Sequence, residues 1–467
     1  MNYPPFDLIV IGGGPGGYVA AIRATQLGMK TALVEKAQLG GICLNWGCIP
    51  TKALLRSADV LRQARNAEAF GVRVGTAQAD LPAMVARSRA VAGQLNKGVA
   101  HLMKKNGVTV LAGHGRLTGG GSIEVTDQDG SVAKLTARNI ILATGARSRQ
   151  VPGLESDGKT VWTYRDALAP PSVPKRMLIV GAGAIGIEFA SFYHAIGVEV
   201  TVVEMAERIL PVEDSEVSAE VAIRLSRDGI ALRTGTAVKR AERQNMAWDI
   251  ELQGAQGKPP EHVLVDVVLV AAGIVGNVED LGLENTAVKV EKTHIVTDAF
   301  SRTDERGVYA IGDVAGPPWL AHKASHEGVI CVEAIAGLKP HALEPKQIAA
   351  CTYSHPQVAS VGLTEAQAKA SGYQLKVGKF PFAANGKAIA MGSTTGFVKV
   401  VFDDASGELL GAHMVGDEVT EMIQGFVIGR TLETTEAELM ASILPHPTMS
   451  EAMHEAVLAA YERALHI

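Results

Sequence analysis

Residues 6–17 read FDLIVIGGGPGG, and residues 177–186 read MLIVGAGAIG. Each stretch is an apolar, strand-like run that ends in the pattern Gly-x-Gly-x-x-Gly. A helical pattern follows, and then a second apolar run that ends in an acid. One match is weak in a chain with 50 glycines. Two matches in the same context indicate two Rossmann-like units, each of which binds a dinucleotide.

The glycines and the acid of each pattern are expected to have separate functions. The first glycine makes the tight turn, the second lets a pyrophosphate approach the backbone, and the third lets helix and strand pack closely. The helix N-terminus faces the phosphates, and the acid can accept hydrogen bonds from ribose hydroxyls. The residues are Gly12, Gly14, Gly17 and Glu35 in the first copy, and Gly181, Gly183, Gly186 and Glu204 in the second.

The two sites are expected to hold different nucleotides. A 2′-phosphate would meet a like charge at Glu204, and no basic cluster follows it, so the second site favours NAD(H) over NADP(H). The first site lies just before two cysteines. A flavin is expected there, because a flavin can take two electrons from a thiolate and pass them on as hydride.

Cys43 and Cys48 lie in residues 40–52, GGICLNWGCIPTK, and the chain has only four cysteines. Five residues along a regular helix separate two Cα atoms by roughly 8.7 Å, whereas a disulfide needs less than about 7 Å. Gly47 and Pro50 permit the bend that would bring the two together. We interpret the pair as a reversible dithiol beside a redox cofactor. Two unrelated buried thiols are the alternative.

Composition excludes several classes of function. The net charge is −5 and no stripe of basic residues appears, so nucleic acid is not expected as a partner. No apolar run reaches the roughly 18 residues that a membrane helix needs. Four cysteines form no disulfide framework, and the thirteen histidines show no metal-ligand spacing, so no metal is expected. A cytoplasmic enzyme, or a mature enzyme of the mitochondrial matrix, fits this composition.

Two further segments fit a flavin site. Thr144 and Gly145 follow the apolar run 139–142, and Gly312 and Asp313 follow the run 308–311. The aspartate could bind a polyol chain. The alternative for each segment is an ordinary strand end with turn residues.

The chain resembles the pyridine nucleotide-disulfide oxidoreductases, and among them the flavoproteins that act on dihydrolipoyl groups. The resemblance covers essentially the whole chain. Besides the two glycine patterns it rests on Cys43–Lys52, Ala143–Gly145, Gly312-Asp313, Ala321–Ala324 and His446–Glu451. It implies an α/β fold with two Rossmann-like domains plus a C-terminal α+β dimerisation domain. The expected parts are an FAD domain (1–150), an NAD domain (151–275), a central segment completing the FAD site (276–345) and the dimerisation domain (346–467).

The resemblance also implies a role for each site residue. Cys48 is similar to the flavin-facing thiolate, which forms a charge-transfer pair with oxidised FAD, and Cys43 to the thiol that exchanges with substrate. Lys52 would place a positive charge near the flavin. His446 would be the base for the thiols, oriented by Glu451 and supplied by the neighbouring subunit of a homodimer. The expected cofactor contacts are Thr144, Gly145, Gly312, Asp313 and Ala321 for FAD, and Glu188 and Gly273 for NAD.

The implied activity is oxidation of dihydrolipoyl groups with reduction of NAD⁺, and the implied partners are lipoyl domains of a 2-oxo acid dehydrogenase complex or of the glycine cleavage system. A glutathione-type reductase would need basic residues after the second acidic strand end. A mercuric reductase would carry a second cysteine pair near its C-terminus, and none follows Cys351. A non-catalytic FAD- and NAD-binding redox sensor is the alternative of another class.

Three segments have less definite expectations. Residues 273–277 read GIVGN, where many relatives have an arginine after the glycine, so the role of this loop is open. Cys331 and Cys351 are expected to be small buried hydrophobes without chemistry. The apolar segment 422–428 fits either a dimer interface or the core.

Overall fold

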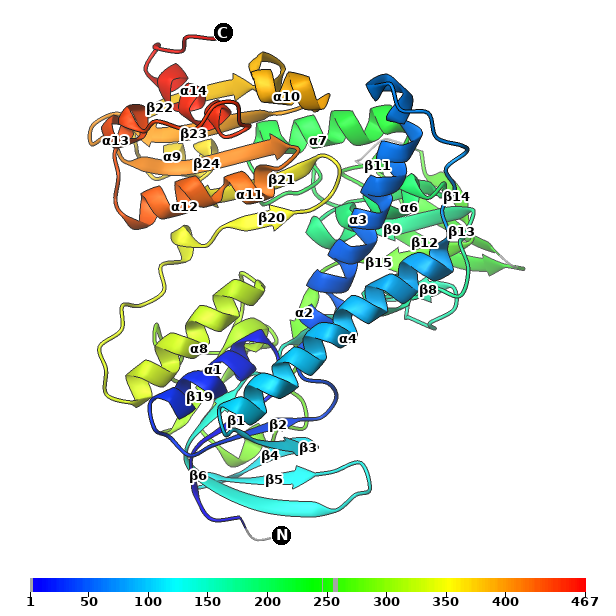
Figure 1. The fold of residues 1–467 in the computed structure, drawn as a ribbon. Helices are drawn as coiled ribbons and strands as arrows, with labels where there is room; N and C mark the ends of the chain where they lie inside the picture. The colour runs from blue at the N-terminus through cyan, green and yellow to red at the C-terminus, as the bar shows by residue number, and fades with distance from the viewer. Residues whose placement is uncertain (1–2, 246, 255–258) are drawn as a thin grey trace. The chain divides into compact units, whose positions relative to one another are not determined.

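The computed structural model describes residues 3–245, 247–254 and 259–467. Its contacts divide the chain into two compact units, each assembled from segments far apart in the sequence (Figure 1). The first comprises Met1–Leu54, Pro82–Arg149 and Gly273–Leu343, and the second comprises Leu55–Leu81, Gln150–Ala272 and Glu344–Ile467. The sequence alone placed the boundaries at 150, 275 and 345.

The first unit is built on a seven-stranded sheet. Strands β3, β2, β1 and β6 run parallel in that order, β19 pairs parallel with β6, and β6 continues into an antiparallel ribbon with β5 and β4. The strands are β1 (Phe6–Ile11), β2 (Thr31–Glu35), β3 (Thr109–Ala112), β4 (His114–Gly119), β5 (Ser122–Thr126), β6 (Val132–Leu142) and β19 (Val308–Ala310). Buried parallel strands need apolar residues on both faces, and β1 carries them in its last four positions.

Helices flank this sheet. α1 and α8 pack closely because glycines stand at their contact: a Cβ on Gly328 would lie 2.8 Å from the carbonyl oxygen of Gly16. The helices that begin in this part of the chain are α1 (Pro15–Gln26), α2 (Gly41–Trp46), α3 (Cys48–Arg65), α4 (Leu81–Lys105), η3 (Gly312–Ala315) and α8 (Ala321–Ile335). Two small ribbons, β7 (Ala146–Ser148) with β16 (Ile274–Gly276) and β17 (Val290–Glu291) with β18 (His294–Ile295), complete the unit with η2 (Leu283–Asn285).

The second unit contains a five-stranded parallel sheet in the order β11–β10–β9–β15–β8, and a three-stranded antiparallel sheet, β12–β13–β14. The elements are η1 (Ala67–Phe70), β8 (Val161–Trp162), α5 (Tyr164–Leu168), β9 (Arg176–Val180), α6 (Ala184–Ala195), β10 (Glu199–Val203), α7 (Ser215–Asp228), β11 (Ala231–Arg233), β12 (Ala237–Gln244), β13 (Ala247–Gln253), β14 (Glu261–Val265) and β15 (Val267–Val270). α6 begins at Ala184, because the last residues of the glycine pattern already form its first turn.

The C-terminal part of the second unit is a five-stranded antiparallel sheet in the order β20–β21–β24–β23–β22. α14 lies against β22, where a Cβ on Gly378 would come within 2.0 Å of the carbonyl oxygen of Ala456. The elements are η4 (Pro345–Gln347), β20 (Ala350–Thr352), β21 (Gln357–Gly362), α9 (Glu365–Ala370), β22 (Leu375–Pro381), η5 (Phe382–Ala384), α10 (Gly386–Met391), β23 (Phe397–Asp403), β24 (Leu409–Gly416), α11 (Val419–Met422), α12 (Gln424–Thr431), α13 (Glu436–Ala441) and α14 (Glu451–Ala460). The predicted α/β class with a C-terminal α+β part is confirmed.

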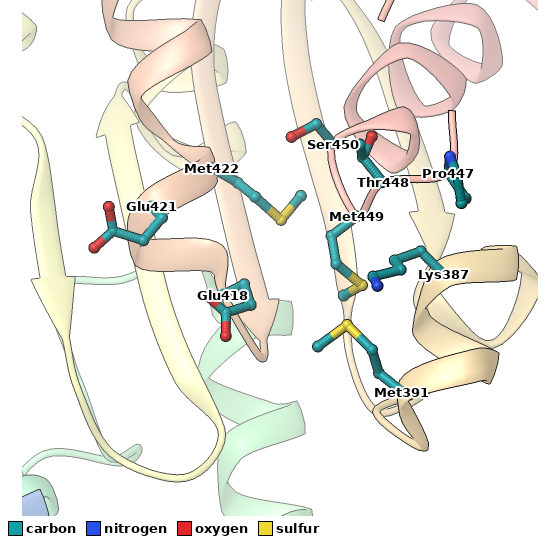
Figure 2. A pocket seen from close by; sticks show the side chains of 9 residues that line it. All are labelled: Lys387, Met391, Glu418, Glu421, Met422, Pro447, Thr448, Met449 and Ser450. Carbon is teal, nitrogen blue, oxygen red and sulfur yellow. The ribbon is translucent and has the colours of Figure 1, made fainter. Parts of the chain in front are cut away.

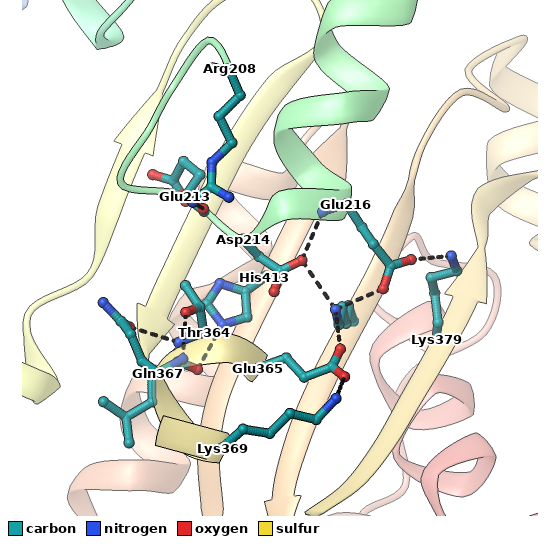
Figure 3. A network of polar contacts seen from close by, with 12 residues as sticks. Arg208, Glu213, Asp214, Glu216, Thr364, Glu365, Gln367, Lys369, Lys379 and His413 are labelled. Carbon is teal, nitrogen blue, oxygen red and sulfur yellow. Dashed lines mark hydrogen bonds and ion pairs between the residues drawn. The ribbon is translucent and has the colours of Figure 1, made fainter. Parts of the chain in front are cut away.

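Ion pairs of a buried lysine join this C-terminal sheet to α7, and Figure 3 shows their carboxylate partners Asp214, Glu216 and Glu365. Lys399 on β23 is 1 % exposed, and its ammonium lies 3.1 Å from Asp214, 2.7 Å from Glu216 and 2.7 Å from Glu365. Hydrogen bonds from Lys369 and Lys399 lower the pKa of Glu365 to about 2. Three carboxylates compensate one buried cation, as burial of an ion requires.

Candidate active site

The first glycine pattern forms a turn that only glycine can make. Gly12 has φ +109°, and a Cβ there would lie 2.2 Å from the carbonyl oxygen of Ala143. A Cβ on Gly17 would lie 1.8 Å from the carbonyl oxygen of Gly12, so α1 could not pack on β1. At Gly14, in contrast, the nearest atom to such a Cβ is 3.9 Å away. The first and third glycines are therefore needed by the fold, whereas the second faces space.

The second pattern repeats this geometry. A Cβ on Gly181 (φ +106°) would meet the carbonyl oxygen of Ala271 at 2.4 Å, and one on Gly186 would meet that of Gly181 at 1.9 Å. No atom lies within 4 Å of a Cβ built on Gly183. In both copies the second glycine is the N-cap of the helix and provides no side-chain cap. An open glycine before uncapped helical N–H groups fits the pyrophosphate of FAD or of NAD.

The acids at the strand ends support the same turns. Glu35 accepts hydrogen bonds from the backbone N–H groups of Gly13 (2.6 Å) and Ala37 (2.7 Å). Glu204 accepts from those of Ala182 (2.8 Å) and Ala206 (2.8 Å). Each carboxylate therefore fixes the glycine loop and keeps lone pairs that can accept from ribose hydroxyls. This loop-bracing role was not predicted from the sequence.

The two cysteines lie on either side of a break between helices. α2 ends at Trp46, Gly47 leaves helical geometry (φ −144°, ψ −112°), and α3 begins at Cys48. The expected bend is thus at Gly47, whereas Pro50 lies inside the first turn of α3. No disulfide joins the two cysteines in the structure.

The two sulfurs interact directly with each other. The hydrogen bond from Cys43 to Cys48, together with burial, raises the pKa of the Cys43 thiol far above its ordinary value, while Lys52 acts in the lowering direction. A proton held on one sulfur stabilises negative charge on the other. Since only the thiolate is a nucleophile or an electron donor, this arrangement suits a pair of cysteines that exchanges electrons.

The Gly312-Asp313 turn is anchored by a buried ion pair from α8. Glu327 accepts a hydrogen bond from the Gly312 N–H (2.7 Å) and lies 3.0 Å from the ammonium of Lys323, which also donates to the carbonyl oxygen of Gly316 (2.8 Å). Burial raises the pKa of Asp313, against the influence of Lys323. Ala321 begins α8. A carboxyl group presented in this way could accept from the hydroxyl groups of a flavin side chain.

Lys323 and Glu327 were not singled out as site residues in the sequence. Their spacing of four residues on a helix is a recognisable ion-pair pattern. What it cannot reveal is that the pair folds back onto a turn that precedes the helix.

Thr144 and Asn277 connect two strand ends of the first unit. Thr144 donates to the carbonyl oxygen of Asn277 (2.8 Å), and Asn277 donates to that of Thr144 (2.9 Å). Gly145 and Gly273 have φ of +70° and +101°. The loop that lacks the expected arginine therefore forms part of an antiparallel ribbon, β7 with β16, and Arg147 of β7 pairs at 2.6 Å with Glu279, which follows β16. No cofactor contact of Gly273 follows from this geometry.

Glu188 lies on the first turns of α6 and is 5 % exposed. It accepts a hydrogen bond from the backbone N–H of Tyr353 at 2.9 Å. One turn later on α6, Ser191 accepts from the backbone N–H of His355 at 3.0 Å. The helix that follows the second glycine pattern is thus fastened to the segment after β20.

His446 and Glu451 form the second chemical group, and both belong to the second unit. Nδ1 of His446 lies 2.9 Å from Glu451, whose other oxygen accepts from the Thr448 N–H at 2.8 Å. Burial would raise the pKa of Glu451, but these two hydrogen bonds outweigh burial and lower it. The imidazole is 78 % exposed. With Nδ1 directed at the carboxylate, Nε2 is the nitrogen that can exchange a proton with a substrate.

A shallow hollow of about 460 Å³ adjoins this motif (Figure 2). Its lining combines thioether and charged side chains with the backbone that follows His446. The residues are Lys387, Met391, Glu418, Glu421, Met422, Pro447, Thr448, Met449 and Ser450.

The remaining expectations have mixed outcomes. Cys331 is fully buried, as expected, whereas Cys351 is half-buried and packs against the core of the C-terminal sheet. In the segment 422–428, Ile423 and Phe426 are in the core while Ile428 is 60 % exposed. Among the described residues, no helix has both the length and the apolar character required to span a membrane.

Comparisons with known proteins agree with this geometry. Residues 6–328 match the family model described as pyridine nucleotide-disulphide oxidoreductase, and residues 348–457 match the dimerisation domain of that family. The chain is 57 % identical to a dihydrolipoyl dehydrogenase of Zymomonas mobilis, with 99 % of both chains covered. It is 53 % identical to one of Rhizobium etli (98 % of this chain and 99 % of the relative) and 47 % identical to one of Bacillus subtilis (99 % of both).

Solved structures show the same architecture. The crystal structure of LpdA from Mycobacterium tuberculosis superposes with a TM-score of 0.90 at 27 % identity, covering 96 % of this chain and 98 % of that one. The HOCl-induced flavoprotein disulfide reductase RclA of Escherichia coli, in its Cu(II) complex, gives a TM-score of 0.87 at 25 % identity, covering 97 % and 99 %. The matching dimerisation domain supports a homodimer, and the expected use of FAD and NAD agrees with the family. The chain belongs to the pyridine nucleotide-disulphide oxidoreductases.

Proposed function

We propose that this chain is a dihydrolipoyl dehydrogenase, which oxidises protein-bound dihydrolipoyl groups to lipoyl groups and reduces NAD⁺ to NADH. The observation that carries the proposal is the Cys43–Cys48 pair, hydrogen-bonded across a helix break within the unit that begins with the first dinucleotide turn. The relatives of highest identity quoted above carry the same activity in their names.

The chemistry starts with the disulfide form of the pair. Nε2 of His446 of the partner subunit takes the proton of a substrate thiol. Glu451 of the partner subunit holds this imidazole in place. The substrate thiolate attacks Sγ of Cys43, the Cys43–Cys48 bond breaks, and its electron pair stays on Cys48. The second substrate thiol then attacks the substrate sulfur of the mixed disulfide, and the bond to Cys43 breaks. Cys43 takes up the proton that this thiol loses, and oxidised lipoyl leaves. The pair has gained two electrons, and the lipoyl group has lost two.

The residues of the two glycine turns would hold the cofactors. Gly14 would approach the pyrophosphate of FAD in the turn that Gly12 and Gly17 shape, and Asp313 would bind its polyol chain. Gly183 and Glu204 would bind NAD at the turn that Gly181 and Gly186 shape, with Glu188 near the nicotinamide. Bound FAD would supply the two-electron transfer that links the Cys43–Cys48 pair to NAD⁺. Lys52 favours negative charge on the sulfur side of this exchange.

The wider setting follows from the activity. The substrate is a lipoyl domain of a 2-oxo acid dehydrogenase complex or of the glycine cleavage system, and the homodimer shares its active sites between subunits. We assign residues 1–150 to the FAD domain, 151–275 to the NAD domain, 276–345 to the central segment and 346–467 to the dimerisation domain. The relatives are largely bacterial, and we place the enzyme in the cytoplasm.

One assay separates the candidates. The purified, FAD-loaded protein is given dihydrolipoamide with NAD⁺, and glutathione disulfide with NADPH or NADH. Turnover of dihydrolipoamide with NAD⁺ is expected. Turnover of glutathione disulfide with NADPH would instead indicate a glutathione-type reductase, and no turnover with any pair would indicate a redox sensor.

The cysteines are tested one at a time. Cys43→Ser and Cys48→Ser should both abolish dihydrolipoamide turnover, but only Cys48→Ser should remove the long-wavelength absorbance of the two-electron-reduced protein. Cys351→Ser is the matched control and should keep both. An unchanged band in Cys48→Ser would contradict the assignment of the two sulfurs.

A further inference from the structure

One helix of the first unit, α4, supports the backbone of the redox segment from the side. Its side chains donate to carbonyl oxygens on both sides of the two cysteines: Asn96 to Leu39 (2.6 Å), Arg89 to Asn45, Ser88 to Pro50 (2.9 Å) and Arg87 to Ala53 (2.8 Å). Ser88 is fully buried. Of these four donors, only Arg89 reaches a carbonyl between Cys43 and Cys48.

Arg89 contacts both residues that end α2. Its Nη2 donates to the carbonyl oxygen of Asn45, and its guanidinium carbon lies 4.2 Å from the ring centroid of Trp46. The last carbonyl groups of a helix have no donors within the helix, and they attract positive charge. A planar guanidinium can meet this carbonyl with its edge and stack on the indole with its face, which an ammonium cannot do. Arg89 therefore fits this position through its shape as well as its charge.

The position of Arg89 is maintained against a desolvation penalty. Burial lowers the pKa of Arg89, and its Nη1 is buried without a hydrogen-bond partner among the described residues. A partly buried guanidinium with one unpaired buried nitrogen is destabilising unless its other contacts compensate. Those contacts are concentrated on Asn45 and Trp46, immediately before the helix break at Gly47.

Holding this turn matters for a reversible pair. In the structure the two cysteines are not bonded to each other, yet they remain hydrogen-bonded across the break. Once a disulfide is open, the proximity of its sulfurs depends on the backbone between them. A rigid backbone keeps the effective concentration of one thiol at the other high, and this favours closure of the disulfide.

We propose that Arg89, acting through Trp46 and the Asn45 carbonyl, is a positioning residue that holds the Cys43–Cys48 turn in one conformation whether the disulfide is open or closed. The proposal rests on the redox role of the two cysteines given under the proposed function. Arg89 sets how strongly the disulfide is favoured over the dithiol. The positive charge that favours a thiolate comes from a different residue, Lys52.

The test is the equilibrium between disulfide and dithiol in the FAD-loaded enzyme. The protein is equilibrated with mixtures of dihydrolipoamide and lipoamide, and the long-wavelength absorbance reports the fraction in the two-electron-reduced form. In Arg89→Met the equilibrium should move toward the dithiol by about tenfold, which corresponds to about 30 mV for a two-electron couple. Arg89→Lys, which keeps the charge but loses the planar stack, should give a shift in the same direction.

Two further variants make the result specific. Arg87→Met removes a guanidinium from the same helix that binds a carbonyl beyond Cys48, and it should leave the equilibrium within twofold of the parent. Trp46→Leu removes the stacking partner and should shift the equilibrium as Arg89→Met does. The double variant Arg89→Met/Trp46→Leu should shift it no further than the larger single change, because the two residues act as a unit.

The outcomes distinguish this proposal from the assigned activity. FAD content and the melting temperature establish that each variant is folded, and Trp46→Leu alone decides the matter if Arg89→Met does not fold. An unchanged equilibrium in the folded variants, or an equal shift in Arg87→Met, would overturn the positioning role of Arg89. A parent enzyme that dihydrolipoamide cannot reduce would instead overturn the assigned activity.

Discussion

Nδ1 of His446 lies 2.9 Å from the carboxylate of Glu451, and the same carboxylate accepts a hydrogen bond from the Thr448 N–H. Glu451 thus holds both the imidazole and the loop that carries it. In Glu451→Gln the amide cannot accept from both groups in this geometry, because one of its two positions is a donor. We expect a loss of dihydrolipoamide oxidation that approaches that of His446→Gln, about 10²- to 10⁴-fold.

Separate assays of the two half-reactions check this role. Reduction of the bound flavin by NADH, measured with an artificial electron acceptor, involves no substrate thiol and should be retained in both variants. His454→Gln, on the same helix as Glu451 and hydrogen-bonded to the carbonyl oxygen of Met440, is the control. Equal losses in both half-reactions would argue against a role for His446 as the base.

The glycines of the first turn should separate binding from folding. A Cβ on Gly14 meets open space, whereas a Cβ on Gly17 would lie 1.8 Å from the carbonyl oxygen of Gly12. Gly14→Ala should therefore fold and melt like the parent when FAD is absent, but bind FAD at least tenfold more weakly, because phosphates approach this glycine closely. Gly17→Ala, in contrast, should lower the stability of the FAD-free protein.

Thermal melts of the FAD-free proteins and FAD titrations measure the two effects. The second turn offers an independent repeat, in which Gly183→Ala should raise the KM for NAD⁺ and Gly186→Ala should destabilise the chain. If Gly14→Ala were as unstable as Gly17→Ala, the space at Gly14 would not be a binding site.

The buried ammonium of Lys399 should be essential for stability. Lys399→Met removes the cation that compensates Asp214, whose side chain is 2 % exposed, and leaves that carboxylate buried without its partner. Breaking a buried pair in this way costs about 3–5 kcal/mol. Lys379 pairs with Glu216 at 2.5 Å, but both side chains are well exposed, so Lys379→Met should cost less than about 1 kcal/mol. Denaturant unfolding of the two variants compares these values.

The same cluster predicts how stability depends on acid. The pKa of Glu365 is about 2 in the folded chain, below its ordinary value of 4.5. A depressed pKa contributes stability that is fully present above pH 4.5 and is lost as the pH falls toward 2. Melting temperatures between pH 6 and pH 3 should therefore fall more steeply in the parent than in Glu365→Gln. Parallel curves would show that Glu365 contributes nothing to this loss.

Local sequence determined much of the molecule. The glycine patterns required backbone conformations and close contacts that other residues cannot make, so both turns, their helices and the acids behind them could be placed in advance. The spacing of Cys43 and Cys48 required a break in the helix, and the break is at Gly47. His446 and Glu451 were close enough in the chain for their pairing to be expected.

Tertiary structure decided what depends on distant segments. Arg89 is 43 residues from Trp46, and Lys323 is held against a turn that precedes its own helix, so no local pattern indicates either contact. In the sequence, Lys399 is a single charged residue in an apolar strand, and only the fold brings Asp214, Glu216 and Glu365 to it. Periodicity and backbone strain are properties of neighbouring residues and can be read from the sequence. The partners of a buried charge are chosen by packing, which brings them together only in the folded chain.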